Sequence, residues 1–477
     1  MTDSIRERYE EYNWEPVAQR HMRSVYRLTR EGHHVLYLKI YHPRSPLQML
    51  RNLLAAKTQK EARMLYMLYK EGINVPSVVN HLKCGSVSAL VTRGIEGARP
   101  LWELDENSRV KIMLDMVLLL LQRGFYHQDL HIGNIMMDAK GDAYLVDVYN
   151  VSRLKNVKER HALGMLSQVL MAHDYQDDEL TDYLGGLPFI KDTKAIIKRA
   201  RTLAEANRKS WVRGNVRRSL RRGSFSDKID TSDYNAFVKR GVRIDLDNTI
   251  ASHWENISRG VNILKFQDKT QLSKVDSYCV KAYARPKFSR GPYALRAWKG
   301  LLTLYFNDIP VPEPVAVVVF RDKSSMLITR YLDFMTLDKV FYHDYKDMDY
   351  EKKVKLLNDV GILVGLMHSK GIYHADLKAC NFLFDKDKGL FLVDTDRVVQ
   401  SRAISMRRML KNLIQLNTSI PLSVSRAARM RFIKAYSGLV HEDHRELFRE
   451  VWLLSRHREI VYTTAQGDRM ETWDYPS

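Results

Sequence analysis

Two stretches of the chain repeat one polar pattern. "YHQDLHIGNIMMDAKGDAYLVDVYN" covers residues 126–150, and "YHADLKACNFLFDKDKGLFLVDTDR" covers 373–397. In each, an Asn follows the first Asp by five residues and a second Asp follows it by eighteen. The two sets are Asp129, Asn134 and Asp147, and Asp376, Asn381 and Asp394. Carboxylate and amide oxygens at a repeated spacing predict a metal site, and the repetition predicts two related domains.

Phosphoryl transfer is the chemistry that these residue types fit best. It needs a cation on the nucleotide phosphates, oxygen ligands for Mg²⁺ and a carboxylate near the attacking hydroxyl. Lys39 lies in the alternating segment 34–41, which predicts a strand, and Glu61 lies in the predicted helix 54–72, where it could hold the ammonium. Asp129 would orient the hydroxyl and accept its proton. Asn134 and Asp147 would bind the metal.

The second copy repeats the set with one gap. Lys281 lies in "SYCVKAYA", and Asp376, Asn381 and Asp394 repeat the other roles. The position that corresponds to Glu61 is Ala297, flanked by the cationic Arg296 and Lys299. Like charges would push an ammonium away, so we expect the first site to be better assembled while both bind nucleotide and metal.

The order of strand Lys, helix Glu, HxDxxxxxN and a later Asp resembles the protein-kinase-like set. "HQDLHIGN", with His131 two residues after the Asp, "YLVDVYN", "EGINVPSVV" and "DIPVPEPVAVV" make the chain similar to the bacterial lipopolysaccharide core kinases. This resemblance implies an α+β fold of two tandem bilobal domains, each with a small β-rich N-lobe and a helical C-lobe. It also implies ATP with Mg²⁺ or Mn²⁺ as cofactors. The implied acceptor is a heptose or Kdo hydroxyl of lipid A–core or another glycolipid.

The chain departs from the kinase pattern at several points. Neither copy has a GxGxxG loop before its Lys, so the phosphates must be held otherwise, and neither has a literal DFG. Lys378 stands where the first copy has His131; a Lys there resembles the catalytic loop of Ser/Thr protein kinases and could touch the transferred phosphate. Two alternatives therefore stay open: a Ser/Thr protein kinase, and a pair in which one domain is a nucleotide-binding pseudokinase scaffold.

Composition narrows the class of protein and its partners. With 477 residues, 45% of them hydrophobic, the chain is long enough for two domains with sizeable cores. A net charge of +20 indicates an anionic partner. Three scattered cysteines favour a reducing compartment over a zinc site or a disulfide framework. Without an apolar N-terminal segment we expect a cytoplasmic protein, and no nucleic-acid motif is present.

Two predictions concern the middle of the chain. The domain boundary is expected near residues 205–215, giving domains 1–205 and 206–477. Residues 198–222 predict a strongly basic helix in which Trp211, Val212, Val216 and Leu220 interleave with arginines. That pattern is typical of a helix at a lipid headgroup surface, so we expect peripheral docking on an anionic membrane. The apolar run 112–121 is too short to span a bilayer and predicts a buried helix.

Overall fold

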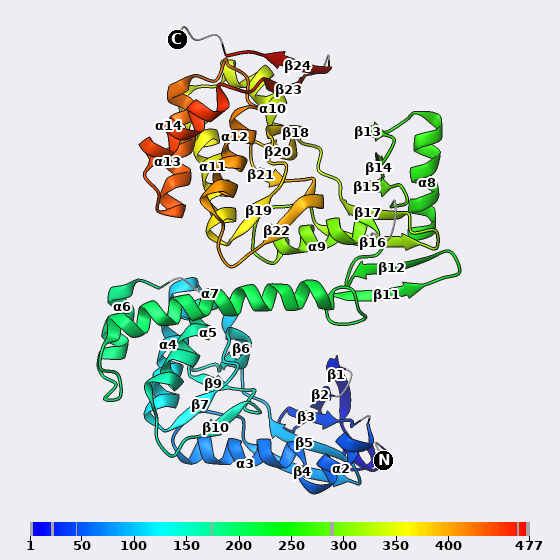
Figure 1. The fold of residues 1–477 in the computed structure, drawn as a ribbon. Helices are drawn as coiled ribbons and strands as arrows, with labels where there is room; N and C mark the ends of the chain where they lie inside the picture. Colours follow the sequence, from blue (N-terminus) through cyan, green and yellow to red (C-terminus); the bar gives the residue numbers. More distant parts are fainter. Residues whose placement is uncertain are drawn as a thin grey trace. The chain divides into compact units, whose positions relative to one another are not determined.

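The chain forms two compact units, Met1–Arg208 and Lys209–Ser477. The computed structural model describes residues 3–20, 23–43, 45–172, 175–286, 291–464 and 467–473 (Figure 1). The division falls three residues after the predicted boundary and lies inside one continuous helix, α7 (Thr193–Arg218). Each unit carries an antiparallel sheet followed by a helical part, as the sequence predicts.

The first unit begins with a five-stranded antiparallel sheet in the order β1-β2-β3-β5-β4. On β3, Leu38 and Ile40 are buried against the apolar cluster of one sheet face, so Lys39 between them points to the opposite face. Helix α3 (Lys57–Lys70) covers that opposite face and ends before Gly72, whose φ of 77° is favourable only for glycine. The strands are β1 (Asn13–Arg20), β2 (Arg23–Thr29), β3 (Leu36–Tyr41), β4 (Val78–Cys84) and β5 (Val87–Arg93).

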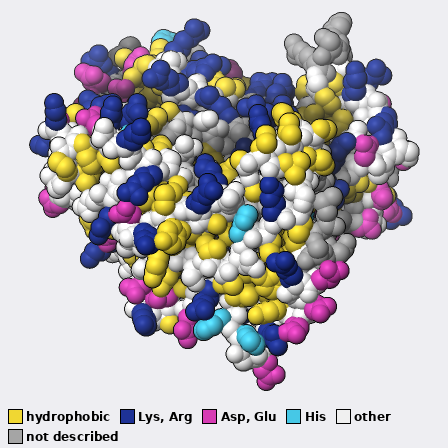
Figure 2. Space-filling model, turned by 90° about the horizontal axis from the view of Figure 1, so that it is seen from below, with side chains coloured by type: hydrophobic (Ala, Val, Ile, Leu, Met, Phe, Trp, Pro, Cys, Tyr) yellow, Lys and Arg dark blue, Asp and Glu magenta, His cyan; other side chains and the backbone are white. Residues whose placement is uncertain are grey.

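A separate short helix, α2 (Pro46–Leu54), lies between β3 and α3. Ser45 caps it and Pro46 occupies its first turn, both of which favour a helix start. Its leucines are exposed. Figure 2 shows one face of the molecule, on which hydrophobic side chains gather between Lys and Arg side chains. The predicted helix 54–72 therefore begins later than expected, at Lys57.

The helical part of the first unit packs around α4 (Glu106–Gln122), which contains the predicted buried helix 112–121. Helices α5 (Glu159–Ala172), α6 (Asp177–Gly185) and the start of α7 complete its core. Short strand pairs bracket the polar repeat: β7 (Phe125–His127) pairs with β10 (Val151–Arg153), and β8 (Ile135–Met137) pairs with β9 (Ala143–Leu145). The repeat is therefore held on both sides by strands that enter the core.

The second unit has a seven-stranded sheet in the order β11-β12-β16-β17-β15-β14-β13. Val280 and Ala282 face the cluster under α8 (Leu246–Arg259), so Lys281 points to the other face, which α9 (Tyr293–Tyr305) covers. The strands are β11 (Ser226–Asp230), β12 (Tyr234–Lys239), β13 (Ile263–Gln267), β14 (Thr270–Val275), β15 (Tyr278–Tyr283), β16 (Pro314–Phe320) and β17 (Ser325–Arg330).

The helical part of this unit is formed mainly by α11 (Tyr350–Ser369), α12 (Met406–Asn417), α13 (Arg426–Val440) and α14 (His444–Ser455), and the hairpin of β23 (Ile460–Thr464) and β24 (Gly467–Glu471) follows them. Gly361 and Gly365 let α11 approach α13 closely, since an added Cβ at Gly361 would lie 2.5 Å from the Phe432 carbonyl oxygen. The second repeat again lies between short strands, β19 (Ile372–His374) with β22 (Val398–Gln400), and β20 (Phe382–Asp385) with β21 (Gly389–Leu392).

The predicted basic helix 198–222, most of which lies in α7, does not have the role that the sequence pattern predicted. Val212 and Val216 on α7 are buried in the core of the second unit, and Leu220 beyond it packs against the same core. Trp211 is exposed but packs edge-to-face on Phe306 at 5.7 Å. Val212, Val216 and Leu220 therefore stabilise the unit and are not available to a headgroup layer, so the interfacial interpretation of this helix was wrong. None of the helices in the described ranges is both long and apolar enough to cross a bilayer.

Candidate active sites

In the first unit, Lys39 pairs with Glu61. The Lys39 ammonium donates to Glu61 Oε1, and the Tyr41 hydroxyl donates to Glu61 Oε2 at 3.3 Å. The Glu61 side chain is 2% exposed. A strand cation and a helix anion thus meet on the sheet face that α3 covers, as the sequence predicts.

Asp147 lies on the other side of the same ammonium. Its Oδ1 is 3.8 Å from Lys39 Nζ, and its Oδ2 accepts a hydrogen bond from Arg23 at 3.4 Å. Burial alone would raise the pKa of Asp147, but the charges of Lys39 and Arg23 more than offset this and hold it below its usual value. The carboxylate is therefore ionised at neutral pH and suited to a cation.

Hydrogen bonds shape the loop that carries Asp129. Asn134 Nδ2 donates to the Asp129 carbonyl at 2.7 Å, which fixes the amide and leaves its Oδ1 as the ligand atom. His127 accepts the Asp129 N–H at Nδ1 (3.1 Å) and lies 2.9 Å from the Asp147 carbonyl at Nε2. A carbonyl only accepts, so Nε2 carries the proton. Burial lowers the pKa of His127, and a neutral imidazole joins the two Asp segments.

The second unit holds its lysine without a helix glutamate. Lys281 Nζ lies 2.6 Å from Asp394 Oδ1 and 3.0 Å from Asp396 Oδ2. The Tyr283 hydroxyl donates to the other oxygen of Asp396 at 2.6 Å. Tyr41 and Tyr283 both follow the lysine by two residues, so Asp396 receives the same two donors as Glu61. The expectation that Lys281 lacks an anchor was wrong, because the carboxylate comes from the turn after Asp394.

Small residues on α9 bring that turn into place. Ala297 is fully buried, and its carbonyl accepts a hydrogen bond from Thr395 Oγ1 at 3.0 Å. A Cβ on Gly300 would lie 2.1 Å from the Thr395 carbonyl oxygen. Asp394 itself adopts φ 57°, a left-handed conformation that Asp tolerates better than most residues. The turn packs directly on the helix surface from which a glutamate would project.

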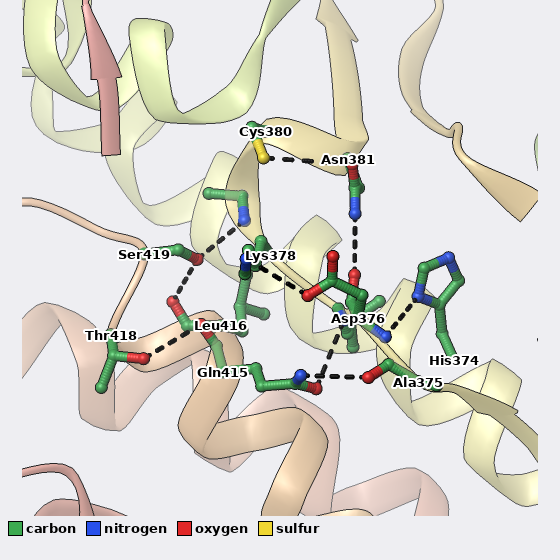
Figure 3. A network of polar contacts seen from close by, with 12 residues as sticks. His374, Ala375, Asp376, Lys378, Cys380, Asn381, Gln415, Leu416, Thr418 and Ser419 are labelled. Carbon is green, nitrogen blue, oxygen red and sulfur yellow. Dashed lines mark hydrogen bonds and ion pairs between the residues drawn. The ribbon is translucent and has the colours of Figure 1, made fainter. Parts of the chain in front are cut away.

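The second catalytic loop repeats the first (Figure 3). Asn381 Nδ2 donates to the Asp376 carbonyl at 2.7 Å, and His374 lies 2.9 Å from the Asp394 carbonyl. The Lys378 ammonium is 3.3 Å from Asp376 Oδ1, and its side chain is half exposed. Burial raises the pKa of Asp394, but Lys281, with smaller contributions from His374 and Lys265, brings it below the usual value. The structure thus places five predicted site residues close together, namely Lys281, Asp376, Lys378, Asn381 and Asp394.

Each unit has a donor set that fits Mg²⁺ in the presence of phosphates. One carboxylate and one amide oxygen come from Asp147 and Asn134, and from Asp394 and Asn381. Over the described ranges no cluster of three or more His, Cys, Asp or Glu side chains could hold a metal unaided. Mg²⁺ in nucleotide sites is commonly bound by one or two carboxylates plus phosphate oxygens, so these sets suit a metal that arrives with a nucleotide.

Sequence reasoning missed several residues around these sites. Arg23 and Lys265 come from the hairpins that precede each lysine and bring positive charge toward Asp147 and Asp394. Gln168 and Gln415 clamp the catalytic loops: Gln168 Oε1 accepts the Leu130 N–H at 2.6 Å, and Gln415 Nε2 donates to the Ala375 carbonyl at 3.1 Å. Both glutamines follow the loop Asp by 39 residues, a repeated spacing that could have revealed them.

The Cys380 side chain is partly buried beside Asn381. Burial raises its pKa to about 11, so it is protonated at neutral pH. Its Sγ lies 3.9 Å from Asn381 Oδ1.

The two units match different family models. Residues 19–169 match the model described as "RIO domain", and residues 264–436 match "Lipopolysaccharide kinase (Kdo/WaaP) family". The chain is 25% identical over 123 residues to the 3-deoxy-D-manno-octulosonic acid kinases of Xylella fastidiosa strains M23 and Temecula1 / ATCC 700964. The match covers 24% of this chain and 47% of each relative, so the chain spans about half the length of these relatives.

Three of the solved structures that match part of the chain do so at low similarity. An aminoglycoside-3'-phosphotransferase of type VIII is 19% identical with a TM-score of 0.31, covering 43% of this chain and 97% of that one. The WbdD co-crystal structure with the kinase inhibitor LY294002 is 18% identical with a TM-score of 0.29, covering 43% and 49%. The M. tuberculosis PknI kinase domain is 14% identical with a TM-score of 0.27, covering 42% and 96%. At these values the likeness carries no information on substrate.

Proposed function

Because the chain carries a RIO-type domain and a lipopolysaccharide kinase (Kdo/WaaP) family domain, both of the protein-kinase-like superfamily, we propose that it is an ATP-dependent sugar kinase. The proposed acceptor is a heptose or Kdo hydroxyl of the lipopolysaccharide inner core. The observation that carries this proposal is the Lys281–Asp394–Asp396 cluster beside Asp376 and Asn381 in the unit that matches the Kdo/WaaP family.

The proposed roles follow from the contacts. Lys281, held by Asp396, binds the nucleotide phosphates, and Lys39, held by Glu61, does the same in the first unit. Asp376 and Asp129 position the acceptor hydroxyl and take its proton as its oxygen bonds to the γ-phosphorus of ATP and the bond from that phosphorus to ADP breaks. Asn381 with Asp394, and Asn134 with Asp147, would hold Mg²⁺ or Mn²⁺, which neutralises charge on the phosphates when bound. Lys378, 3.3 Å from Asp376, contributes positive charge where the phosphate is transferred.

The two units suit different tasks under this proposal. The first matches a RIO domain and the second a lipopolysaccharide kinase domain. This difference favours, as a second candidate, a pair in which the second unit transfers phosphate to the sugar and the first is a nucleotide-binding scaffold. A Ser/Thr protein kinase is the remaining alternative, and it would label a protein or itself.

The test is transfer of labelled phosphate from ATP. The full chain is mixed with core lipid purified from a strain that lacks this gene, and with the same lipid after removal of its inner-core sugars. We expect label on the intact lipid only, with Mg²⁺ required. Label on protein in both reactions would replace the proposal with the protein-kinase alternative. A lipid acceptor also implies that the protein acts at the cytoplasmic face of the membrane, bound there as a peripheral protein.

A further inference from the structure

Helix α2 exposes its apolar residues to solvent and buries a polar one, which is the reverse of the usual arrangement in a surface helix. Its apolar residues are Leu47, Met49, Leu50, Leu53 and Leu54, and all five are exposed. The one side chain of α2 that is buried is the polar Asn52, 6% exposed. At 100° per residue, Asn52 lies opposite the midpoint between Leu50 and Leu54, so the leucine face points to solvent.

Specific hydrogen bonds hold the helix in this orientation. Asn52 Nδ2 donates to the Ser86 carbonyl at 2.6 Å and to Ser88 Oγ at 3.1 Å, and Asn52 Oδ1 accepts the Lys57 N–H at 3.0 Å. Lys83 on β4 donates to the Leu53 carbonyl at 2.6 Å. These contacts attach the polar side of α2 to the sheet. A face of five aliphatic side chains, rigidly presented, is costly in water unless something covers it.

The positive charge around this face indicates which kind of partner could cover it. From Gly32 to Lys60 the sequence contains no acidic residue. The exposed cation Arg51 lies on the helix and Lys83 adjoins it, whereas the ammonium groups of Lys57 and Lys60 lie over the Tyr149 ring. A second copy meeting this face by two-fold symmetry would bring the same cations against each other. An apolar layer beneath negative charge matches the surface better.

We propose that α2 is a membrane-docking element that inserts Leu50 and Leu54 into the headgroup–acyl boundary of an anionic bilayer. Exposed aliphatic residues with adjacent cations are the features of an interfacial helix. The surface is distinct from the basic helix α7, whose valines are committed to the core. This inference goes beyond phosphoryl transfer and does not depend on which acceptor the kinase uses.

Sedimentation of the full chain with lipid vesicles tests the proposal. Vesicles of phosphatidylcholine alone are compared with vesicles that also contain phosphatidylglycerol, at low and high salt. We expect binding to the anionic vesicles, weakened by salt. The Leu50→Gln/Leu54→Gln double variant should bind about tenfold or more weakly, because the aliphatic surface that enters the bilayer is lost. Arg51→Gln should reduce binding to anionic vesicles about fivefold, as expected for one cation at the surface.

The matched control is Leu453→Gln/Leu454→Gln, which removes two exposed leucines from α14 in the second unit. We expect this control to bind vesicles as the unaltered chain does, and both double variants to unfold at unchanged temperature. Equal loss in both double variants, or no loss in the α2 variant, would overturn the proposal. So would an unaltered chain that ignores anionic vesicles, or one that self-associates through α2 in sedimentation velocity runs.

Discussion

The two units hold equivalent lysines with carboxylates from different parts of the chain. Lys39 is held by Glu61 from a helix, whereas Lys281 is held by Asp396 from the turn after the metal-site Asp. At the position of Asp396 the first unit has Tyr149, whose ring lies 6.3 Å from that of Tyr41. At the position of Glu61 the second has Ala297. In both units the lysine ammonium and the tyrosine hydroxyl donate to a single carboxylate. That carboxylate can come from the helix after the lysine strand or from the turn after the metal-site Asp.

The largest expected effect separates the two sites as catalysts. Asp129→Asn and Asp376→Asn each remove the carboxylate that would accept the hydroxyl proton in one site. Such a change lowers the rate of phosphate transfer at a working site by about 10²–10⁴-fold. Phosphate transfer to core lipid is measured for each variant. We expect Asp376→Asn to abolish transfer to the sugar, since it lies in the lipopolysaccharide-kinase unit. If Asp129→Asn alone abolished transfer, the complete Lys–Glu pair would mark the working site and the second unit would be the scaffold.

The next effect tests whether Asp396 replaces Glu61. Loss of a hydrogen bond to a charged group costs about 1.5–3 kcal/mol, so Asp396→Asn should weaken nucleotide binding to the second site about tenfold to hundredfold. Binding is measured in a chain whose first site carries Lys39→Ala, and Glu61→Gln is measured in a chain carrying Lys281→Ala. Asp387→Asn, in an exposed turn of the second unit, is the control. Unchanged affinity in Asp396→Asn would leave Asp394 as the sufficient anchor.

The next prediction tests whether the small residue Gly300 is what lets the turn of residues 394–396 reach Lys281. Gly300→Ala would place a Cβ 2.1 Å from the Thr395 carbonyl oxygen, and such overpacking should destabilise the second unit by about 1–3 kcal/mol. Thermal unfolding monitored by fluorescence measures this. Gly438→Ala is the matched control, because that helical position has nothing within 4 Å of the added carbon. Equal stability of the two variants would mean that the turn does not depend on the small residue.

The smallest effect concerns pH. Lys39 and Arg23 hold the pKa of Asp147 below its usual value, so the stabilisation from these pairs is present above the ordinary carboxyl pKa and is lost as pH falls through the lowered one. Arg23→Gln removes one of the two charges and should raise the pKa of Asp147. The acid limb of metal-dependent nucleotide binding by the first unit should then move to higher pH, while that of the second unit stays in place. Movement of both limbs together would point to a change in the whole fold.

The sequence predicted the parts of the sites that depend on short-range patterns. Alternation in segment 34–41 predicted the strand that carries Lys39, and the repeated spacing placed Asp129 with Asn134 and Asp376 with Asn381. The anchor of Lys281 could not be predicted, because Asp396 reaches it only where Ala297 and Gly300 let the turn pack on α9. Periodicity also could not tell that Val212 and Val216 face a core, since core and headgroup-facing residues have the same spacing. The sequence pattern predicted no helix or strand for residues 46–53.

The close packing of Gly300 against the Thr395 carbonyl also limits how one arrangement can evolve into the other. A glutamate at position 297 would need space that the turn already fills, and it would place a third acid around Lys281. Losing Asp396 first would leave Asp394 as the remaining carboxylate at a largely buried lysine. Each single substitution is therefore expected to weaken the contacts that hold the lysine, so one change alone cannot convert one anchor into the other.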